Sequence, residues 1–417
     1  MWFVIVGLVT KIDVVLLTYK PYSAAKLFLP LLALALALKV ATEGTWRRFL
    51  GRELWPLYGL AALVLLPVGY AFNAHDWELY QKWTLSFGSY MVLFLAIYAV
   101  ADDAACRRRL LIAIIAAAAV GAIYSLMQAH LGTTYAMGHA RNPDILPRPW
   151  GPLDDPNFSS GVFIIGLFFS LYLMLPGHRV RRWGAWGGAA SALLFVWALA
   201  ATQSMGALLA LAIGAAALPA LVLLLRWRPE RRTLLVALVA GEVAILLAFL
   251  LFVALHEVNA FGMADTLTEI KTKNVSARIA SFRYALDLFR GNPVFGAGPW
   301  NDFHRGLDAA YGYTAGHVVH NTLLAIVGTL GLLGAAMYGL LVLWCIRGLS
   351  HVAAHRRQPW HGVLAAAIPA ALFLTIQAQS QSLQMITSIP LWISLALPYL
   401  IDPADRPGSF AFPARRR

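Results

Sequence analysis

The sequence predicts an all-α polytopic membrane protein, with about twelve transmembrane helices and a ~60-residue, partly helical outer loop between the ninth and the tenth. The first observation is the composition: 60% of the 417 residues are hydrophobic, 13% are charged, and the mean hydropathy is +0.67. This composition excludes an ordinary soluble domain. The second is a series of apolar runs of spanning length, and the third is the placement of Lys and Arg in alternate connections.

Each apolar run long enough to cross a bilayer predicts one helix. The runs lie at roughly residues 2–18, 22–38, 54–72, 83–100, 110–130, 158–176, 183–203, 205–225, 233–255, 318–346, 362–382 and 384–401. The first lacks a basic start and a small-residue cleavage site, and Lys11 and Asp13 interrupt it, so we interpret it as an uncleaved helix. We expect residues 1–417 to form a single integral membrane domain that ends in a short basic tail at 402–417.

Most of the 33 Lys and Arg residues fall in the connections that follow even-numbered runs. The positive-inside rule makes these connections and both termini cytoplasmic. The net charge of +13 then anchors cytoplasmic loops beside anionic lipid, and it is no indication of nucleic-acid binding. Cys106 and Cys345 fall at cytoplasmic helix ends, in a reducing compartment, so no disulfide is expected.

Three outer connections have an unusual polar composition: residues 131–157, the turn at 202–206, and a long segment at 256–318. In the last, apolar residues recur at helical spacing opposite charged ones, which predicts an amphipathic helix on the bundle or bilayer surface. The apolar residues are Ile279, Phe282, Leu286 and Phe289, and the charged ones are Arg283, Asp287 and Arg290. Gly291, Asn292 and Pro293 are expected to end this helix, and Gly296 and Gly298 to form a turn. The alternative is a lid that only covers the bundle.

A His-Asn pair, His320 and Asn321, stands where the long outer segment becomes the tenth run. The positive end of the helix dipole favours a neutral imidazole, and therefore a usable general base. Alternatively, His320 and Asn321 only cap the helix. His317 is a candidate second donor, or else an ordinary loop histidine.

Glycines recur every three residues in the tenth run, at Gly328, Gly331 and Gly334. Along a continuous helix this spacing predicts one bare face for close helix contact.

Arg278 begins the amphipathic helix, and its guanidinium can grip two phosphate oxygens at once. Arg283 and Arg290 are alternatives for that role. Any one of them can instead belong to a solvated face, and Arg283 can form an ion pair with Asp287 one turn away.

Asp154, Asp155, Pro156 and Asn157 precede the sixth run and are typical of a helix start. The two carboxylates could also bind a divalent cation, but no further acidic or histidine partner stands nearby, so we predict no metal. Glu242 and Asp13 are intramembrane carboxylates, for which we prefer structural pairing with a polar neighbour.

The sequence has no Walker loop, GxGxxG, HExxH, CxxC or GxSxG motif, so nucleotide-driven, zinc and serine-hydrolase chemistries lose support. No cofactor is expected. The energy for a reaction must therefore come from the substrate, and a group activated by a membrane-anchored diphosphate fits this best.

Residues 275–335 resemble the O-antigen ligase family, which includes the related O-antigen polymerases and protein O-oligosaccharyltransferases. The family pattern is His, then Asn, Ser or Gln, nine residues, Gly, two residues, then Gly, Thr or Tyr, and the chain matches it at His320, Asn321, Gly331 and Gly334. Further similar positions are Arg278, Phe282, Pro293, Phe295, Gly296 and Gly298, and the Asp-Pro-Asn of residues 155–157. At the 202–206 turn, Met205 replaces an arginine that the family associates with the diphosphate, so Arg148, Arg278 or Arg283 would have to supply that charge.

The resemblance implies metal-independent, inverting transfer of a glycan from undecaprenyl diphosphate on the periplasmic face of the inner membrane. His320 would be the base, arginines would hold the diphosphate, and lipid A-core oligosaccharide would be the acceptor of a ligase. The same residues would serve an O-antigen or exopolysaccharide polymerase. A protein glycosyltransferase would be expected to carry a larger outer or terminal domain. A lipid or glycan transporter is the alternative from another class of protein. It does not explain why the unusual polar residues gather on one face of the protein, in the long outer segment.

Overall fold

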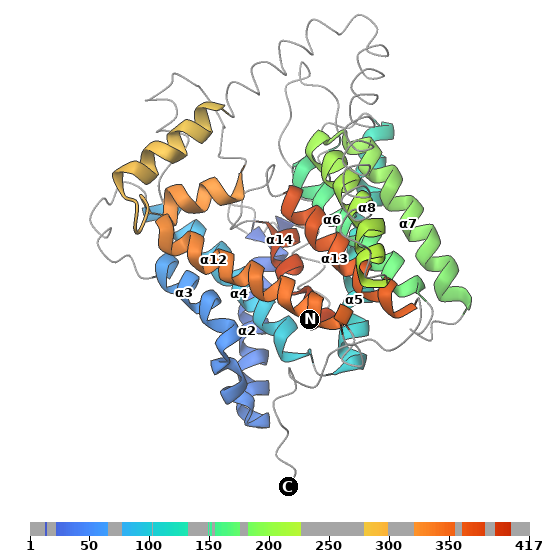
Figure 1. Cartoon of the computed structure of the whole chain (residues 1–417), viewed down its shortest axis with the longest axis horizontal. Helices are drawn as coiled ribbons and strands as arrows, with labels where there is room; N and C mark the ends of the chain where they lie inside the picture. Colours follow the sequence, from blue (N-terminus) through green and yellow to red (C-terminus); the bar gives the residue numbers. More distant parts are fainter. Residues whose placement is uncertain are drawn as a thin grey trace, which may run out of the picture.

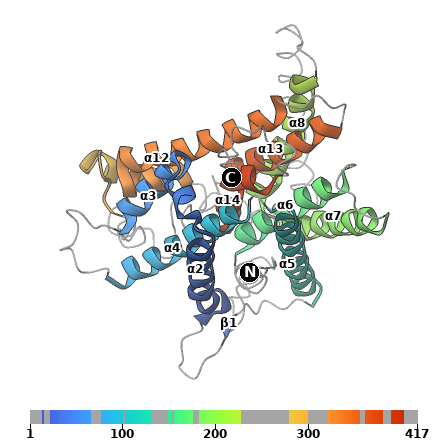
Figure 2. The same ribbon diagram turned by 90° about the horizontal axis from the view of Figure 1, so that it is seen from below.

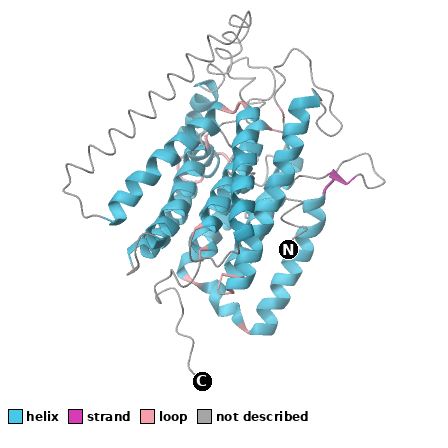
Figure 3. Cartoon of the chain, turned by 90° about the vertical axis from the view of Figure 1, so that its right-hand side faces the viewer, coloured by secondary structure: helices cyan, strands magenta, loops and turns pink. Residues whose placement is uncertain are grey.

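The computed structural model describes residues 13–14, 22–65, 77–101, 103–131, 149, 151, 155–175, 182–226, 279–298, 321–354, 361–379 and 388–401. These residues form a bundle of α-helices, drawn side by side in Figure 3. Apart from one two-residue strand pair, the regular structure of the described residues is helical, as the sequence predicts.

Most of the elements follow the predicted runs closely (Figure 1). They are β1 (Asp13–Val14), β2 (Tyr22–Ser23), α2 (Ala24–Glu43), η1 (Thr45–Leu50), η2 (Arg52–Leu54), α3 (Trp55–Leu65), α4 (Trp77–Ala99), α5 (Ala104–Leu131), α6 (Pro156–Met174), α7 (Arg182–Thr202), α8 (Met205–Arg226), α12 (Thr322–Ala354), α13 (His361–Gln379), α14 (Ile389–Leu395) and α15 (Leu397–Leu400). A further helix covers residues 279–291.

The predicted first helix, at residues 2–18, is wrong at residues 13 and 14. These two residues form a strand that pairs antiparallel with Tyr22–Ser23, in the register Asp13 to Ser23 and Val14 to Tyr22. Asp13 and the β-branched Val14 and Val15 are poor helix formers, which favours the extended form here. The predicted run at 233–255 lies outside the described residues.

Three described helices are long and apolar enough to cross a membrane, at Ala105–His130, Pro156–Met174 and Thr322–Leu349. Shorter apolar helices lie at Phe87–Ala99, Trp186–Thr202, Gly206–Ala217 and Ala367–Gln379. The predicted last span, 384–401, holds two short helices, α14 and α15, which meet at Ala396. These helices identify a membrane protein.

Helix α6 lies at the centre of the bundle, where it packs against α5, α7, α8, α13 and α14. Phe163, Ile164 and Ile165 on α6 are almost completely buried. The Trp392 ring of α14 packs edge-on against Phe87 of α4, with the ring centroids 5.5 Å apart. The short helix α14 is therefore part of the core and not a surface segment.

Helices approach closely where glycine leaves room. A methyl group at Gly166 of α6 would meet the Phe195 ring of α7, and one at Gly214 of α8 would overlap the Thr375 hydroxyl of α13. Small residues allow this backbone contact between membrane helices, whose association depends on packing. The α6–α7 and α8–α13 pairs hold in place the helix ends that carry the candidate site.

A polar cluster closes the end of the bundle where α3 and α5 begin. The Arg48 guanidinium lies 4.7 Å from the centre of the Tyr98 ring, and the Tyr98 hydroxyl donates to Glu53 Oε1 at 2.8 Å. Asp103 caps α5 by accepting from the backbone N–H groups of Ala105 and Cys106. Hydrogen bonding, first from the Cys106 side chain and then from these N–H groups, lowers the pKa of Asp103.

Candidate active site

The helix at 279–291 forms as predicted, and its fully buried residues are small. Ala280, Ser281 and Ala285 are buried, whereas Ile279 and Leu286 are 46% and 39% exposed. The small residues face the protein because they allow α12 to approach this helix closely. Phe282, Tyr284 and Leu288 are partly buried against Ala285 and Ala325, whereas Ile279 and Leu286 remain exposed.

The ion pair of this helix differs from the predicted Arg283–Asp287 pair. Arg290 Nη1 donates to Asp287 Oδ1 at 2.9 Å, and both side chains are at least half exposed. The Arg283 side chain is exposed. The structure therefore leaves Arg283 on the outer surface of the helix.

Helix α12 is broken at Gly331, so the predicted continuous glycine face is wrong. Gly331 has φ 64° and ψ −159°, far from helical values. Residues 322–330 and 332–354 are two helical segments that meet at this residue (Figure 2). Gly328 and Gly334 thus lie on different segments.

The turn at residues 293–298 enters this break. In an unbroken α-helix, the Leu332 and Leu333 N–H groups would donate to the carbonyls of Gly328 and Thr329. Here they donate to Pro293 O at 2.9 Å and Val294 O at 3.2 Å. The Gly328 and Thr329 carbonyls accept instead from the N–H groups of Ala297 and Gly298, each at 2.9 Å. Four hydrogen bonds to the turn stand in place of two helical ones.

Two glycines make this interlock sterically feasible. A methyl group at Gly296 would overlap the backbone of Thr329 and Leu330, and one at Gly331 would overlap Val294 O and Gly296 N. Both residues also have positive φ, 72° and 64°, a region that L side chains rarely adopt. The predicted turn at Gly296 and Gly298 is confirmed, and its partner is the broken helix.

The helix at 279–291 and the first segment of α12 run side by side in the same direction. Ala285 contacts Gly328, where a methyl group would lie 3.1 Å from Ala285 O. Both residues are the seventh of their helices, and both helices lead into the interlocked turn. Their N-terminal ends therefore both point away from the turn, as the gold and orange helices of Figure 1 show.

Asn321 caps the first segment of α12. Its side-chain oxygen accepts from Leu324 N–H at 3.0 Å, and its carbonyl accepts from Ala325 N–H at 2.9 Å. The capping interpretation of Asn321 is thus confirmed. His320, which precedes this cap in the chain, lies outside the described residues, as do His317, Arg278, Arg148, Asp154 and Glu242.

A second group of polar residues gathers at the start of α6. Asp155 caps α6 by accepting from Asn157 N–H at 2.7 Å and Phe158 N–H at 3.0 Å, so the helix-start interpretation is confirmed. The Ser204 hydroxyl donates to Asn157 Oδ1 at 2.6 Å. Gln379 Nε2 donates to Asn157 O at 3.0 Å. Asn157 therefore joins the start of α6 to the α7–α8 turn and to the end of α13.

Two partners in this group, Ser204 and Gln379, were not among the predicted site residues. In the sequence, Gln379 could have been recognised as a polar residue at the end of an apolar run. Ser204 could have been recognised as a polar residue of the 202–206 turn. Gln203 in the same turn has φ 49°, an uncommon value outside glycine. Met205 begins α8, and its side chain is not described.

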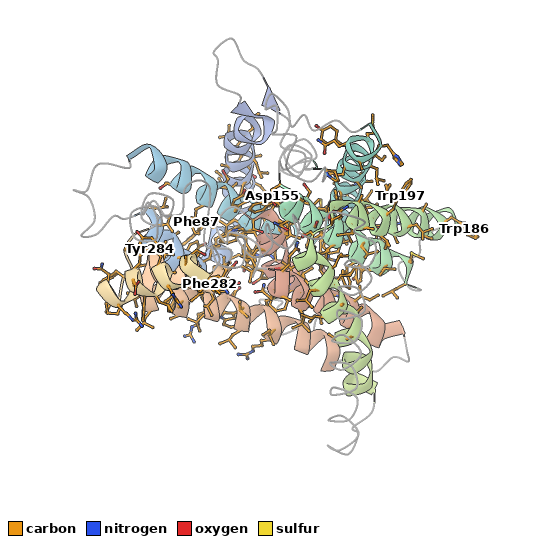
Figure 4. The ribbon with its side chains drawn as sticks, turned by 90° about the horizontal axis from the view of Figure 1, so that it is seen from above. Phe87, Asp155, Trp186, Trp197, Phe282 and Tyr284 are labelled. Atoms are coloured by element: carbon orange, nitrogen blue, oxygen red, sulfur yellow. The ribbon has the colours of Figure 1, made fainter. Side chains whose placement is uncertain are left out.

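The two groups lie at the same end of the bundle. Gln379 links the end of α13 to the start of α6, and two residues before it, Gln377 accepts from the Tyr338 hydroxyl of α12 at 2.8 Å. The α12 residues before Tyr338 extend beyond this level, toward Asn321. Figure 4 shows Asp155 nearer the middle of the bundle, with Phe282 and Tyr284 to one side and Trp186 and Trp197 toward the opposite edge.

Within the described ranges, no three His, Cys, Asp or Glu side chains come together as metal ligands. What the described residues offer is a set of helix N-termini, those of α6, α8, helix 279–291 and α12. Backbone N–H groups at such ends attract anions.

Residues 189–339 match the O-antigen ligase family. The chain contains an O-antigen ligase domain. This domain extends from α7 through the helix at 279–291 to the second segment of α12, so it includes the 293–298 turn and its interlock with Gly331. No curated protein matches the chain. The match confirms the predicted resemblance over these residues and supports an enzyme of the glycosyltransferase-like ligase or polymerase class. Members of this family act on lipid-linked glycans.

Proposed function

We propose that this protein is an O-antigen ligase of the bacterial inner membrane. It transfers a glycan from undecaprenyl diphosphate to lipid A-core oligosaccharide on the periplasmic side, without a metal. The observation that carries the proposal is the parallel packing of helix 279–291 against the start of α12 inside the O-antigen ligase domain. The two N-terminal ends, which Arg278 and His320 directly precede in the sequence, belong to the same end of this helix pair.

The proposed step is a single displacement. His320 accepts the proton of the acceptor hydroxyl, and the hydroxyl oxygen attacks the anomeric carbon of the donor. The bond from that carbon to the diphosphate oxygen breaks, and undecaprenyl diphosphate leaves with the electron pair. Attack from the face opposite the leaving group inverts the configuration at the anomeric carbon.

The leaving diphosphate needs positive charge around it. Arg278 is the first candidate, with Arg283 and Arg148 as further ones, because a guanidinium can bind two phosphate oxygens together. The helix N-termini add fixed partial positive charge. Preorganised donors of this kind stabilise charge that develops in a transition state. Asp155, Asn157, Asn321 and His317 complete the proposed polar surroundings.

The test is product formation by the purified protein in liposomes that contain undecaprenyl-diphosphate glycan and chelator. A ligase places glycan on lipid A-core only when the core is supplied. Longer lipid-linked glycan formed without the core would make the protein a polymerase. Glycan on an added acceptor polypeptide would make it a protein glycosyltransferase, and movement of glycan across the bilayer without any new bond would make it a transporter.

A further inference from the structure

The strongest unassigned feature is the interlock between the 293–298 turn and helix α12. We propose that this interlock is a positioning device for the proposed reaction, with Gly296, Gly328 and Gly331 as positioning residues. It holds the N-terminal ends of helix 279–291 and of the 322–330 segment at a fixed separation. This inference rests on the proposed function, because Arg278 and His320 directly precede those two helix ends in the sequence.

The interlock is made by backbone groups, and its inner part is buried, whereas Val294, Leu332 and Leu333 at its edge are exposed. Its four hydrogen bonds join Pro293, Val294, Ala297 and Gly298 to the two segments of α12. Gly296, Gly298 and Gly331 are buried, and Thr329 and Leu330 are each 1% exposed. Breaking a buried backbone pair leaves unsatisfied polar groups, so the turn and the helix stay together as one unit.

A second contact fixes the angle between the two helices. Ala285 meets Gly328 midway along helix 279–291, while the interlock holds its C-terminal end through the turn. One contact alone would allow the helices to pivot, whereas two separated contacts define their angle. The helix pair is therefore a rigid part of the O-antigen ligase domain.

Rigidity at the turn matters at the far ends of the helices. Six residues of α-helix separate the Ala285–Gly328 contact from each N-terminus, a length of about 9 Å. A tilt of about 5° at the contact would move an N-terminal end by about 1 Å, an error that can reduce the rate of a reaction about 100-fold. None of the three glycines touches the reacting atoms in this proposal, so their effect acts through the helix ends.

Two substitutions test the proposal, and each has a matched control. Gly296→Ala forces a methyl group into the Thr329 backbone, and Gly328→Ala places one 3.1 Å from Ala285 O. Gly339 of α12 and Gly291 of the other helix have no atom within 4 Å of the corresponding position. Gly339→Ala and Gly291→Ala are therefore expected to behave like the unmodified protein. Gly328→Ala is the milder change and serves if Gly296→Ala fails to fold.

The first measurement is kinetic. In liposomes, kcat for glycan transfer should fall about 100-fold in Gly296→Ala and less in Gly328→Ala, as expected for a misplaced catalytic group. KM for undecaprenyl-diphosphate glycan should stay near that of the controls. A rise in KM alone, with kcat unchanged, would overturn the positioning role.

The second measurement does not depend on activity. Spin labels at Ile279→Cys and Leu323→Cys, both on exposed positions near the two N-terminal ends, report the separation in a Cys106→Ser background. We expect a narrow distribution of distances between the two labels in the unmodified protein. A distribution that broadens or shifts in Gly296→Ala or Gly328→Ala, but not in Gly339→Ala, supports the proposal. An unchanged separation in both variants overturns it. If the unmodified protein transfers no glycan, the proposed function fails while the spin-label result still decides the positioning role.

Discussion

The Ser204 hydroxyl donates a hydrogen bond to the side-chain oxygen of Asn157 at 2.6 Å, joining residues 47 positions apart in the chain. This bond fixes the α7–α8 turn against the first turn of α6. It also orients the Asn157 amide, because the oxygen must face Ser204. The amide nitrogen is left as the group that can donate to a bound diphosphate or sugar.

We expect Asn157→Asp to separate structure from binding at this position. A carboxylate still accepts from Ser204, so the melting temperature should stay close to that of the unmodified protein. It lacks the amide donor and adds negative charge beside the diphosphate, so transfer should fall at least about tenfold, the effect of roughly 1.4 kcal/mol. Asn157→Ala should instead destabilise the fold by about 1–3 kcal/mol, because Ser204 loses its acceptor. Full transfer by Asn157→Asp would restrict Asn157 to a structural role.

The α8–α13 contact gives a test of the packing. Gly214→Ala should destabilise the protein by about 1–3 kcal/mol, because its methyl group overlaps the Thr375 hydroxyl and the packed helices must separate. Combining it with Thr375→Ala should recover part of this loss, since the overlapping oxygen is gone. Thermal unfolding in detergent measures both variants, with Gly187→Ala of α7, where nothing lies within 4 Å, as control. Strict additivity of the two changes would contradict the contact.

Much of the fold follows from patterns that act over short stretches of sequence. The apolar runs predict α2 to α8, α12 and α13, because spanning length is a property of one segment. The capping role of Asp155 and the turn at Gly296 were likewise predictable from a few neighbouring residues. Met205 was recognised as a departure from the family pattern, although its side chain is not described.

What sequence reasoning missed depends on contacts between distant segments. The break at Gly331 is stabilised by residues 293–298, so no pattern within 318–346 reveals it, and glycine spacing suggested a continuous helix. The sequence also did not indicate that small residues such as Ala285 make the contact of helix 279–291 with α12, because this contact depends on the close approach of Gly328. The Gln379–Asn157 bond joins residues 222 positions apart in the chain.

His320→Ala tests the proposed base. Transfer should fall by about 10²–10⁴-fold, the usual contribution of general base catalysis, with folding and membrane insertion unchanged. His130→Ala is a suitable control, since His130 is an exposed residue at the end of α5 and contacts the Trp197 ring. Initial rates in liposomes and elution in size-exclusion chromatography provide the two readouts. Undiminished transfer by His320→Ala would rule out the base assignment.

Arg278→Lys tests whether the diphosphate needs a bidentate grip. Lysine keeps the charge but cannot bind two phosphate oxygens through a rigid planar fork, so transfer should fall at least about tenfold. The matched control is Arg290→Lys on the same helix. Arg290 is 75% exposed and pairs with Asp287, an ion pair that lysine can also form at little cost.

The ratio of the two initial rates, measured at saturating acceptor, decides the assignment. Arg278→Lys should be much slower than Arg290→Lys, and raising the donor concentration should not restore it, because the missing contact stabilises charge on the leaving diphosphate. Equal tolerance of both changes would place Arg278 on the solvated surface of the helix. The diphosphate charge would then have to be met by Arg148 or Arg283, which the same lysine substitution can test in turn.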